Sequence, residues 1–192
     1  HDGWKMYWAY SGGDATDDGV HQTDIARWVL GDPAYPAAVH AAGGRLAFPD
    51  DREVPDTQVA TVDYGRTILT FELTQYSPYT IKSTGVEREG QKLPFWPTNG
   101  ERIEIYGTKQ LMYLGRHGVG WQVILADGKE VTHEGGHQAS NEHRANFLEC
   151  VRTRKVPNAD IEKGHHSALL LHLANIGVRL GGRRMVLDAA TE

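Results

Sequence analysis

The apolar positions along the chain change from a helical spacing to a strand-like one and back again. In the first part, apolar residues recur every three or four positions, which predicts a helix from about Asp17 or Asp18 to Leu30. Gly31 follows and is predicted to end this helix. The same spacing near the other end of the chain predicts two more helices, Glu142–Lys155 and Asp160–Leu180.

Between Gln58 and Thr132 the apolar residues instead form short runs rich in β-branched and aromatic side chains. Turn-forming residues separate these runs, namely Tyr64-Gly65-Arg66, Gly107-Thr108 and Asp127-Gly128. Strands joined by tight turns pair in antiparallel fashion, so we expect an open, predominantly antiparallel sheet covered on one face by helices. The predicted fold class is α+β, with residues 1–192 forming a single domain.

The composition is that of an ordinary globular domain: of 192 residues, 40% are hydrophobic and 23% are charged. A net charge of −5 gives no reason to expect nucleic acid or an anionic membrane as a partner. No apolar run is long enough to span a membrane, and the one cysteine, Cys150, cannot form an internal disulfide. The chain starts at His1 with an aromatic cluster, which suggests a segment of a longer polypeptide, and its cellular compartment stays open.

The most promising chemistry lies in Ser11–Trp28, where a glycine-rich turn leads into an acidic segment and then a helix. Asp17 and His21 are four residues apart, so one helical face would carry both. A carboxylate beside an imidazole at the margin of a buried face can move protons near neutral pH. The alternative is that Asp17 or Asp18 only caps the helix while His21 packs. The same face continues with the apolar residues Ile25, Trp28 and Val29.

Ten histidines raise the question of a metal site. The letters of His133–His137 match HExxH, a zinc-protease signature that works only when a helix places both histidines on one face. Two adjacent glycines after a strand argue against a helix here, so we predict a loop and no metal ligand. On the last helix, His165 or His166 is a candidate for a role near a cleft, against the alternative of a hydrogen-bonded core residue.

Signatures of nucleotide binding are missing from the sequence. No GxGxxG follows a strand, and there is no Walker-type loop, CxxC pair or nucleophile elbow. The glycine-rich stretch Arg116–Gly120 joins two predicted strands, which favours turn glycines over a phosphate site. The residues by themselves therefore predict no cofactor-binding position in this chain.

Several segments, taken in order along the chain, resemble one family. Residues 12–33, GGDATDDGVHQTDIARWVLGDP, are similar to the GGGxxxDxGxHxxD segment that opens the C-terminal domain of Gfo/Idh/MocA oxidoreductases. Asp14 stands where relatives often have a third glycine. Further similarity is carried by Pro55–Tyr64, Gly100–Gln110, His143–Gly181 and Leu187–Glu192. The resemblance covers nearly the whole chain and implies this family's substrate domain.

The resemblance implies a two-domain parent whose N-terminal Rossmann domain, absent from this chain, binds NAD or NADP, with no cofactor on this chain alone. Hydride then passes between a substrate carbinol and the nicotinamide, while a lysine of the Rossmann domain and an Asp–His pair handle the hydroxyl proton. By position this pair is Asp17 and His21. Asp24 matches the last aspartate of the motif, and we assign Asp24, His165 and Trp8 to substrate binding. The family also implies a homo-oligomer formed through the sheet.

Three functions remain open at this point. The first is the substrate and oligomerisation domain of an NAD(P)-dependent dehydrogenase acting on a sugar, polyol or cyclitol, without activity by itself. The second is a non-catalytic carbohydrate-binding or assembly module, whose tryptophans stack on sugar rings instead of packing in the core. The third is a metal-dependent sugar lyase or hydrolase that uses the histidine-rich loop. The tryptophans in question are Trp4, Trp8, Trp96 and Trp121.

Overall fold

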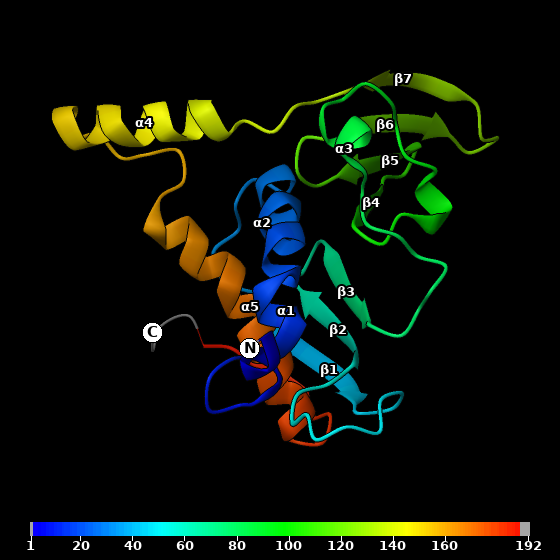
Figure 1. Cartoon of the computed structure of the whole chain (residues 1–192), viewed down its shortest axis with the longest axis vertical. Helices are drawn as coiled ribbons and strands as arrows, with labels where there is room; N and C mark the ends of the chain where they lie inside the picture. Colours follow the sequence, from blue (N-terminus) through cyan, green and yellow to red (C-terminus); the bar gives the residue numbers. More distant parts are fainter. Residues whose placement is uncertain (1, 189–192) are drawn as a thin grey trace. The chain divides into compact units, whose positions relative to one another are not determined.

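The computed structural model describes residues 2–188 (Figure 1). Contacts within the chain divide it into two compact units. Unit 1 comprises His1–Ser77 and Ile161–Glu192, and unit 2 comprises Pro78–Asp160. Each unit has its own sheet and helices, and a single domain over residues 1–192 stays a prediction.

Unit 1 is a four-stranded antiparallel sheet with helices on one face. Its strands lie in the order β3-β2-β1-β8, and the helix α5 packs on β1 with α2 beside it (Figure 1). The elements of this unit are η1 (Asp2–Met6), α1 (Gly13–Asp17), α2 (Gly19–Val29), β1 (Ala38–Gly44), β2 (Thr57–Asp63), β3 (Ile68–Thr74), α5 (Ile161–Arg179) and β8 (Met185–Val186).

Alternate residues of the unit 1 sheet point toward α5 and are buried, as the two-residue period of a strand requires. The buried contacts are those of Val39 and Val62 with Leu170, and of Ala41 and Ala60 with Ala174. The small side chains let α5 lie close to the strands, since a Cβ atom on Gly177 would be 3.3 Å from that of Ala41. The residues between them face away from the helices, and Val59 and Ile68 are 45% and 58% exposed.

The loop between β1 and β2, residues 45–56, is organised around one buried carboxylate. Asp56 is fully buried, and its oxygens accept the backbone N–H groups of Leu46, Ala47 and Phe48 at 3.0 Å each, together with the hydroxyl of Thr57 at 2.8 Å. Burial by itself raises the pKa of this carboxyl, but the hydrogen bonds outweigh burial and lower the pKa from 3.8 to about 2. Asp56 therefore holds the loop as an ionised carboxylate.

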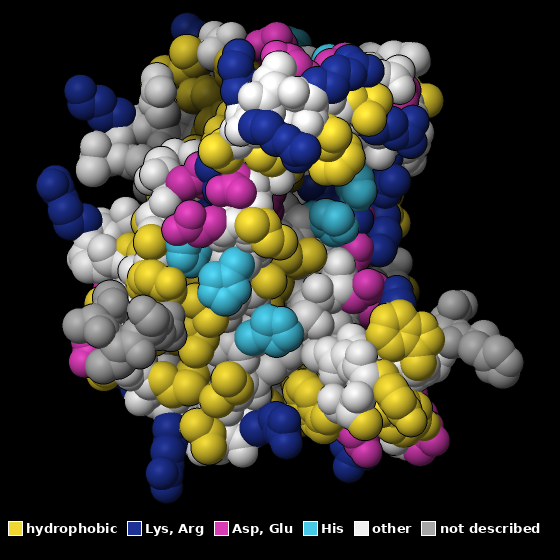
Figure 2. All heavy atoms as spheres, turned by 90° about the vertical axis from the view of Figure 1, so that its left-hand side faces the viewer, with side chains coloured by type: hydrophobic (Ala, Val, Ile, Leu, Met, Phe, Trp, Pro, Cys, Tyr) yellow, Lys and Arg dark blue, Asp and Glu magenta, His cyan; other side chains and the backbone are white. Residues whose placement is uncertain are grey.

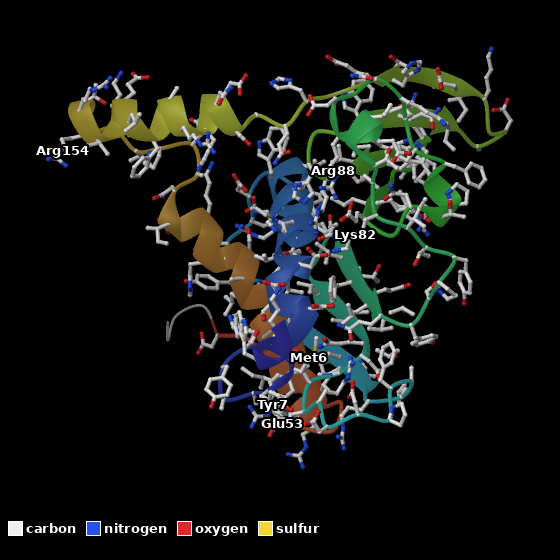
Figure 3. All side chains as sticks on the ribbon, viewed as in Figure 1. Met6, Tyr7, Glu53, Lys82, Arg88 and Arg154 are labelled. Atoms are coloured by element: carbon white, nitrogen blue, oxygen red, sulfur yellow. The ribbon has the colours of Figure 1, made fainter. Side chains whose placement is uncertain are left out.

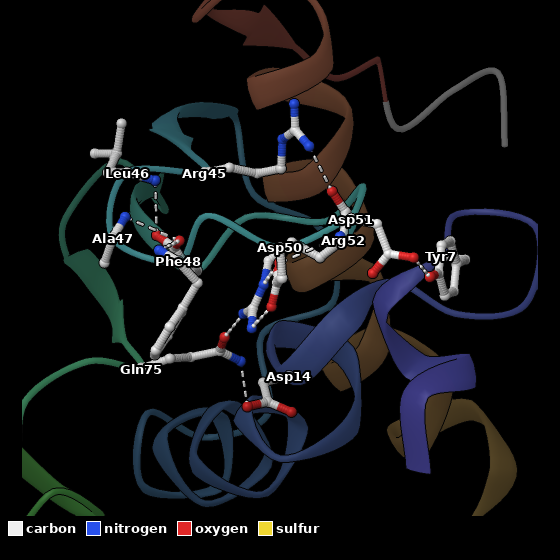
Figure 4. A network of polar contacts seen from close by, with 11 residues as sticks. Tyr7, Asp14, Arg45, Leu46, Ala47, Phe48, Asp50, Asp51, Arg52 and Gln75 are labelled. Atoms are coloured by element: carbon white, nitrogen blue, oxygen red, sulfur yellow. Dashed lines mark hydrogen bonds and ion pairs between the residues drawn. The ribbon is translucent and has the colours of Figure 1, made fainter. Parts of the chain in front are cut away.

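The same loop is tied to the start of α1. Arg52 binds the carboxylate of Asp50 through two hydrogen bonds of 2.7 and 2.6 Å and donates a third, of 2.5 Å, to Gln75 (Figure 4). The amide nitrogen of Gln75 in turn donates to Asp14 in the first turn of α1. The bonds from Arg52 hold the pKa of Asp50 below its ordinary value. A continuous series of polar contacts thus runs from the loop to the acidic motif.

Unit 2 contains the second four-stranded antiparallel sheet, in the order β4-β5-β6-β7. Its elements are α3 (Gly85–Arg88), η2 (Trp96–Thr98), β4 (Arg102–Tyr106), β5 (Gln110–Gly115), β6 (Gly120–Leu125), β7 (Glu130–Glu134) and α4 (Ser140–Thr153). Trp96 is buried, stacks on Tyr113 with ring centroids 5.4 Å apart, and donates to Gln122 at 2.9 Å. Trp96 therefore serves the packing of this unit.

Backbone segments of unit 2 cross one another at glycines. A Cβ atom on Gly135, just after β7, would lie 2.2 Å from the carbonyl oxygen of Gly90. A Cβ atom on Gly136 would lie 2.7 Å from the carbonyl oxygen of Gly118, in the β5–β6 turn. No side chain fits at either position without a shift of backbone, so the glycine pair is required by this crossing.

The α+β class and the antiparallel pairing are confirmed, and the strands are shared between two four-stranded sheets. The turns at Gly65, Gly107 and Gly128 lie where they are predicted. Both later helices, α4 and α5, begin and end within two residues of their predicted bounds. The first predicted helix is confirmed as α2, within two residues of its predicted bounds, and the short helix α1 that precedes it was not predicted. Among residues 2–188, none of the helices has the length and apolar character needed to cross a membrane.

The lowered pKa of Asp56 predicts a pH-dependent loss of stability. A carboxyl whose pKa is depressed on folding stabilises the folded state above its unfolded pKa, and this contribution is lost as the pH falls from about 4 toward 2. We expect Asp56→Asn to lower the free energy of unfolding by about 2 kcal/mol at pH 7, with a smaller difference at pH 2.5. Urea denaturation at both pH values measures this.

The control for Asp56→Asn is Asp127→Asn in the exposed β6–β7 turn, where Asp127 accepts the backbone N–H of Lys129 at 2.9 Å. Asparagine suits such a turn equally well, so this change is expected to stay within about 0.5 kcal/mol. Equal effects of the two substitutions at pH 7 would contradict the assigned role of Asp56.

Candidate functional site

The acidic motif begins where α1 lies against α5. Asn175 of α5 donates from Nδ2 to the carbonyl oxygen of Gly12 at 2.8 Å, and a Cβ atom on Gly12 would lie 2.7 Å from that nitrogen. Gly13 has a φ of +73°, in the left-handed region that a side chain disfavours. The glycine pair therefore fixes the place at which the motif helices start relative to α5.

Asp17 and His21 lie on two successive helices. Asp17 is the last residue of α1, His21 belongs to α2, and Asp18 joins the two helices with φ −101° and ψ −39°. Asp18 occupies the N-cap position of α2, but its side chain makes no capping hydrogen bond. The carboxylate of Asp17 pairs with the ammonium group of Lys5 from η1, and the Asp17 side chain is 39% exposed. The side chain of His21 is exposed as well.

The helix α2 buries a polar stripe instead of an apolar one. Its buried residues, Gly19, Thr23 and Arg27, are spaced by four, and this stripe faces α5. Successive helical residues are about 100° apart, so His21 lies on the opposite face of α2. The residues that share the outward side include Ile25, Trp28 and Val29. The prediction that Trp28 and Val29 continue a buried face is wrong, because they are 68% and 40% exposed, whereas Ile25 is half-buried.

Arg27 is the centre of the contact between α2 and α5. Its guanidinium group is almost fully buried and donates to the carbonyl oxygens of Pro33 (2.8 and 3.1 Å) and Lys163 (3.1 Å) and to the hydroxyl of Ser167 (2.9 Å). Ser167 lies 2.7 Å from Asp24 Oδ1, to which its hydroxyl donates. One oxygen of Asp24 is therefore engaged in the helix contact, while the residue itself remains exposed.

Sequence reasoning missed Arg27 and Ser167, although a signal is present. The residues that face one another recur every fourth position on both helices. On α2 these residues are Gly19, Thr23 and Arg27. On α5 they are Lys163, Ser167, Leu171 and Asn175, the last of which contacts Gly12 before α1. Matching four-residue stripes of this kind are what ridge-into-groove helix packing requires.

The two histidines near the start of α5 have different surroundings. His166 is buried and meets the ring of Tyr35 edge to face, with centroids 4.9 Å apart, whereas His165 is exposed. His165 is two residues from Ser167, so it points away from the α2 contact. Figure 2 shows histidine side chains at the surface among hydrophobic ones. His165 is therefore not part of the buried contact between α2 and α5.

Trp8 lies near the other end of α5. The guanidinium group of Arg179, at the last residue of α5, lies over the Trp8 ring at 5.1 Å, and the backbone N–H of Trp8 donates to Glu53 at 2.9 Å. Along the helix axis, Arg179 is about 20 Å beyond His165. Of the five predicted site residues, Asp17, His21 and Asp24 lie on α1 and α2, His165 lies on α5, and Trp8 lies between η1 and α1.

The histidine-rich segment of unit 2 is not helical between His133 and His137, as predicted. His133 pairs with Glu130 at 2.7 Å, and His137 pairs with Glu142 at 3.1 Å. Hydrogen bonds from Gln122 and then His133 hold the pKa of Glu130 below its ordinary value. Within the described part of the chain, residues 2–188, no three or more His, Cys, Asp or Glu side chains are placed to hold a metal ion.

The chain has the fold of the C-terminal parts of known dehydrogenases. It superimposes on WlbA dehydrogenase from Bordetella pertussis, solved with NADH and UDP-GlcNAcA, with a TM-score of 0.65 and 20% identity over 96% of this chain and 48% of that one. The corresponding enzyme from Chromobacterium violaceum, in complex with the same two ligands, gives 0.63 and 21% over 97% and 49%. GenD2 from gentamicin A biosynthesis, in complex with NAD, gives 0.57 and 17% over 97% and 51%.

The chain spans about half the length of each of these solved chains. No curated protein sequence matches it. The family model described as the GFO/IDH/MocA C-terminal domain matches residues 1–112, which contain the acidic motif and all of β1–β3. The chain belongs to this family of oxidoreductase domains.

The buried guanidinium of Arg27 predicts a large cost of its removal. Arg27→Met would remove the guanidinium group that donates to two carbonyl oxygens and to the Ser167 hydroxyl inside the helix contact. We expect the free energy of unfolding to fall by about 3 kcal/mol, measured by urea denaturation at pH 7. Arg184→Met is the matched control, because Arg184 is 59% exposed beside Asp63 and its loss is expected to cost no more than about 0.5 kcal/mol. A similar cost for both variants would contradict the central role of Arg27.

Proposed function

We propose that this chain is the substrate-binding part of an NAD(P)-dependent oxidoreductase that acts on a hydroxyl group of a sugar, polyol or cyclitol. Membership in an oxidoreductase family supports this proposal. So does the likeness of its fold to dehydrogenases solved with NADH and a nucleotide sugar. The observation that carries the proposal is the outward face of α2, where an exposed histidine, His21, shares a helix side with the exposed indole of Trp28.

In this proposal His21 is the acid–base group for the reacting hydroxyl. An imidazole nitrogen can take the proton from a carbinol as the carbon is oxidised and return it in the reverse direction. Asp17, one turn earlier in the chain, accepts a hydrogen bond from the substrate hydroxyl and orients it. The indole of Trp28 offers a flat apolar surface to the ring of a sugar or cyclitol. Asp24 has one carboxylate oxygen left beyond its bond with Ser167, and it receives a further hydroxyl.

His165 and Trp8 are proposed as more distant substrate contacts, for parts of a substrate that extend beyond the reacting ring. Their separation along α5 argues that one small sugar does not reach both. A larger substrate, such as a sugar carrying a further group, would be needed to touch the α2 face and either of these residues together.

The cofactor is assigned to a part of the parent protein outside this chain. Dinucleotide-binding folds place the pyrophosphate at a helix N-terminus after a strand of a parallel sheet. Both sheets described in residues 2–188 are antiparallel, and the five-residue helix α1 follows a loop. The residues of this chain therefore do not fit a dinucleotide, and we derive for them only the handling of the substrate and its proton.

The outer face of the unit 1 sheet is proposed as a surface for self-association. This face is opposite the helices and carries exposed apolar side chains, including Val59 and Ile68. Its registered neighbours are small or polar, since Ala42 and Glu72 lie opposite Val59 on the two flanking strands. A second copy of the same face would cover these side chains.

A second candidate function is a non-catalytic carbohydrate-binding module. It is favoured by exposed aromatic side chains, because Trp4, Tyr10 and Trp28 are 50%, 71% and 68% exposed and could stack on sugar rings. The two candidates differ in whether they need His21, because stacking on a sugar ring does not require it.

A metal-dependent lyase or hydrolase would require stoichiometric zinc in the purified protein, which elemental analysis measures.

Replacement of His21 tests the catalytic proposal. The complete open reading frame that contains this chain is expressed and screened for reduction of NAD or NADP with sugars and cyclitols. We expect His21→Ala to lower kcat by about a hundredfold or more with the fold intact, because the proton then has no acid–base group. The matched control is His172→Ala, an exposed histidine of α5 that lies outside the α2 face and is expected to leave kcat unchanged. Turnover that is indifferent to His21 would reject the catalytic assignment and leave the binding module.

Replacement of Val59 tests the proposed self-association. Light scattering of the complete protein is expected to give an oligomer, and Val59→Lys is expected to shift it toward the monomer, since a charge then enters the middle of the covered face. Val156→Lys, at a 74% exposed position between α4 and α5, serves as the control and should leave the mass unchanged. A monomeric unmutated protein would contradict the proposal.

A further inference from the structure

We propose that Lys5 is a positioning residue that holds the carboxylate of Asp17 in place for the reaction. This inference rests on the proposed function of the Asp17–His21 pair. The ammonium group of Lys5 contacts Oδ2 of Asp17, and the two side chains are 31% and 39% exposed. Lys5 comes from η1, a segment that lies outside the acidic motif itself.

The two carboxylates of α1 are each held by a donor from another segment. Asp14, at the start of α1, accepts from Gln75, and Asp17, at its end, accepts from Lys5. Contacts of Ser167, Leu171 and Asn175 with α2 and with Gly12 hold the backbone of the motif helices. They do not fix the side-chain rotamer of an exposed carboxylate such as that of Asp17. Only a donor at the carboxylate can do so, and for Asp17 that donor is Lys5.

The backbone that carries Lys5 is itself fastened to the loop of residues 45–56. The carbonyl oxygen of Met6 accepts the N–H groups of Glu53 at 2.8 Å and Val54 at 3.3 Å. Tyr7 donates its hydroxyl to Asp51, as Figure 4 shows, and the next residue along the chain donates its backbone N–H to Glu53. Figure 3 shows Met6, Tyr7 and Glu53 together at this attachment.

This attachment lowers the conformational entropy that is lost when the half-exposed ion pair of Lys5 and Asp17 forms. An isolated surface pair between two free side chains contributes little, because ordering a long lysine side chain offsets most of the attraction. Here the lysine backbone is already ordered by its bonds to the loop, so less freedom is lost when the pair forms. The pair therefore serves orientation more than stability.

The chemical consequence concerns the second oxygen of Asp17. With Oδ2 taken by the ammonium group, Oδ1 is the oxygen left to accept a hydrogen bond from a substrate hydroxyl. The ammonium charge also offsets part of the negative charge of Asp14, Asp17, Asp18 and Asp24, which crowd the motif. Lys5 would thus act through Asp17 and does not need to touch the substrate.

The test is a double-mutant cycle in the complete protein, with kcat and KM measured separately. We expect Lys5→Met to lower kcat by about tenfold with KM changed less than about twofold, because a misoriented carboxylate affects the reacting geometry more than binding. Lys5→Arg is expected to restore most of the rate, since it keeps a cationic donor. In an Asp17→Asn background, Lys5→Met should have no further effect. Arg184→Met, which removes another half-exposed ion pair of unit 1, is the control and should leave kcat unchanged.

The outcomes separate the two proposals. Turnover that depends on Asp17 but is unaffected by Lys5→Met, or additive effects of the two substitutions, would overturn the positioning role alone. Absence of turnover in the unmutated protein would overturn the proposed function and the positioning role with it. Circular dichroism shows whether each variant folds, and if Lys5→Met does not, Lys5→Gln takes its place, because it keeps an uncharged N–H donor on a side chain one bond shorter. A normal rate for Lys5→Gln would then overturn the role of the charge.

Discussion

The part of unit 1 that carries the candidate site depends on the hydrogen bonds of one buried carboxylate, that of Asp56. A carboxylate is taken out of water at a high cost unless hydrogen bonds replace its hydration. Here three backbone N–H groups and the Thr57 hydroxyl replace it, and they outweigh burial strongly enough to lower the pKa to about 2. The loop of residues 45–56 thereby acquires a fixed shape without a helix or strand of its own.

The loop of residues 45–56 does more than connect β1 with β2, because it also holds two other segments in place. Through Arg52 and Gln75 it reaches Asp14 at the start of α1. Through Glu53 and Val54 it holds the backbone next to Lys5. Both ends of α1 are therefore positioned by contacts that originate in one loop: the first series ends at the carboxylate of Asp14 and the second at that of Asp17. A change at Asp56 would act on the motif over this distance without touching it.

The elements of the fold could be predicted from local spacing, because helix and hairpin signals lie within a few residues of one another. The α+β class, the turns and the bounds of α4 and α5 follow from such signals. The orientation of α2 could not, since it depends on partners far away in the sequence. Arg27 has the pattern of a surface residue, and only Pro33, Lys163 and Ser167 make its burial possible.

The candidate site was predictable to the same extent. Asp17, His21 and Asp24 follow from the spacing of the motif and lie on α1 and α2, whereas the break at Asp18 and the pairing of Asp17 with Lys5 arise from tertiary contacts. In unit 2, the letters around Gly135 and Gly136 suggest a metal motif, but a crossing of backbones explains both glycines. A short motif does not reveal whether its glycines serve a ligand or a close approach.

The reversed polarity of α2 is the physical reason to place function on its outward face. A helix whose face toward α5 is Gly19, Thr23 and Arg27 gains little hydrophobic stabilisation from that contact, and it needs several hydrogen bonds to bury one charge. Its largest apolar side chain, Trp28, is meanwhile left 68% exposed beside the side that carries His21. Folding alone would favour the opposite arrangement. An indole and an imidazole kept at the surface at this expense are better explained by what they bind than by the stability of the chain. His133 and His137 of unit 2, which pair with neighbouring glutamates, offer no comparable reason.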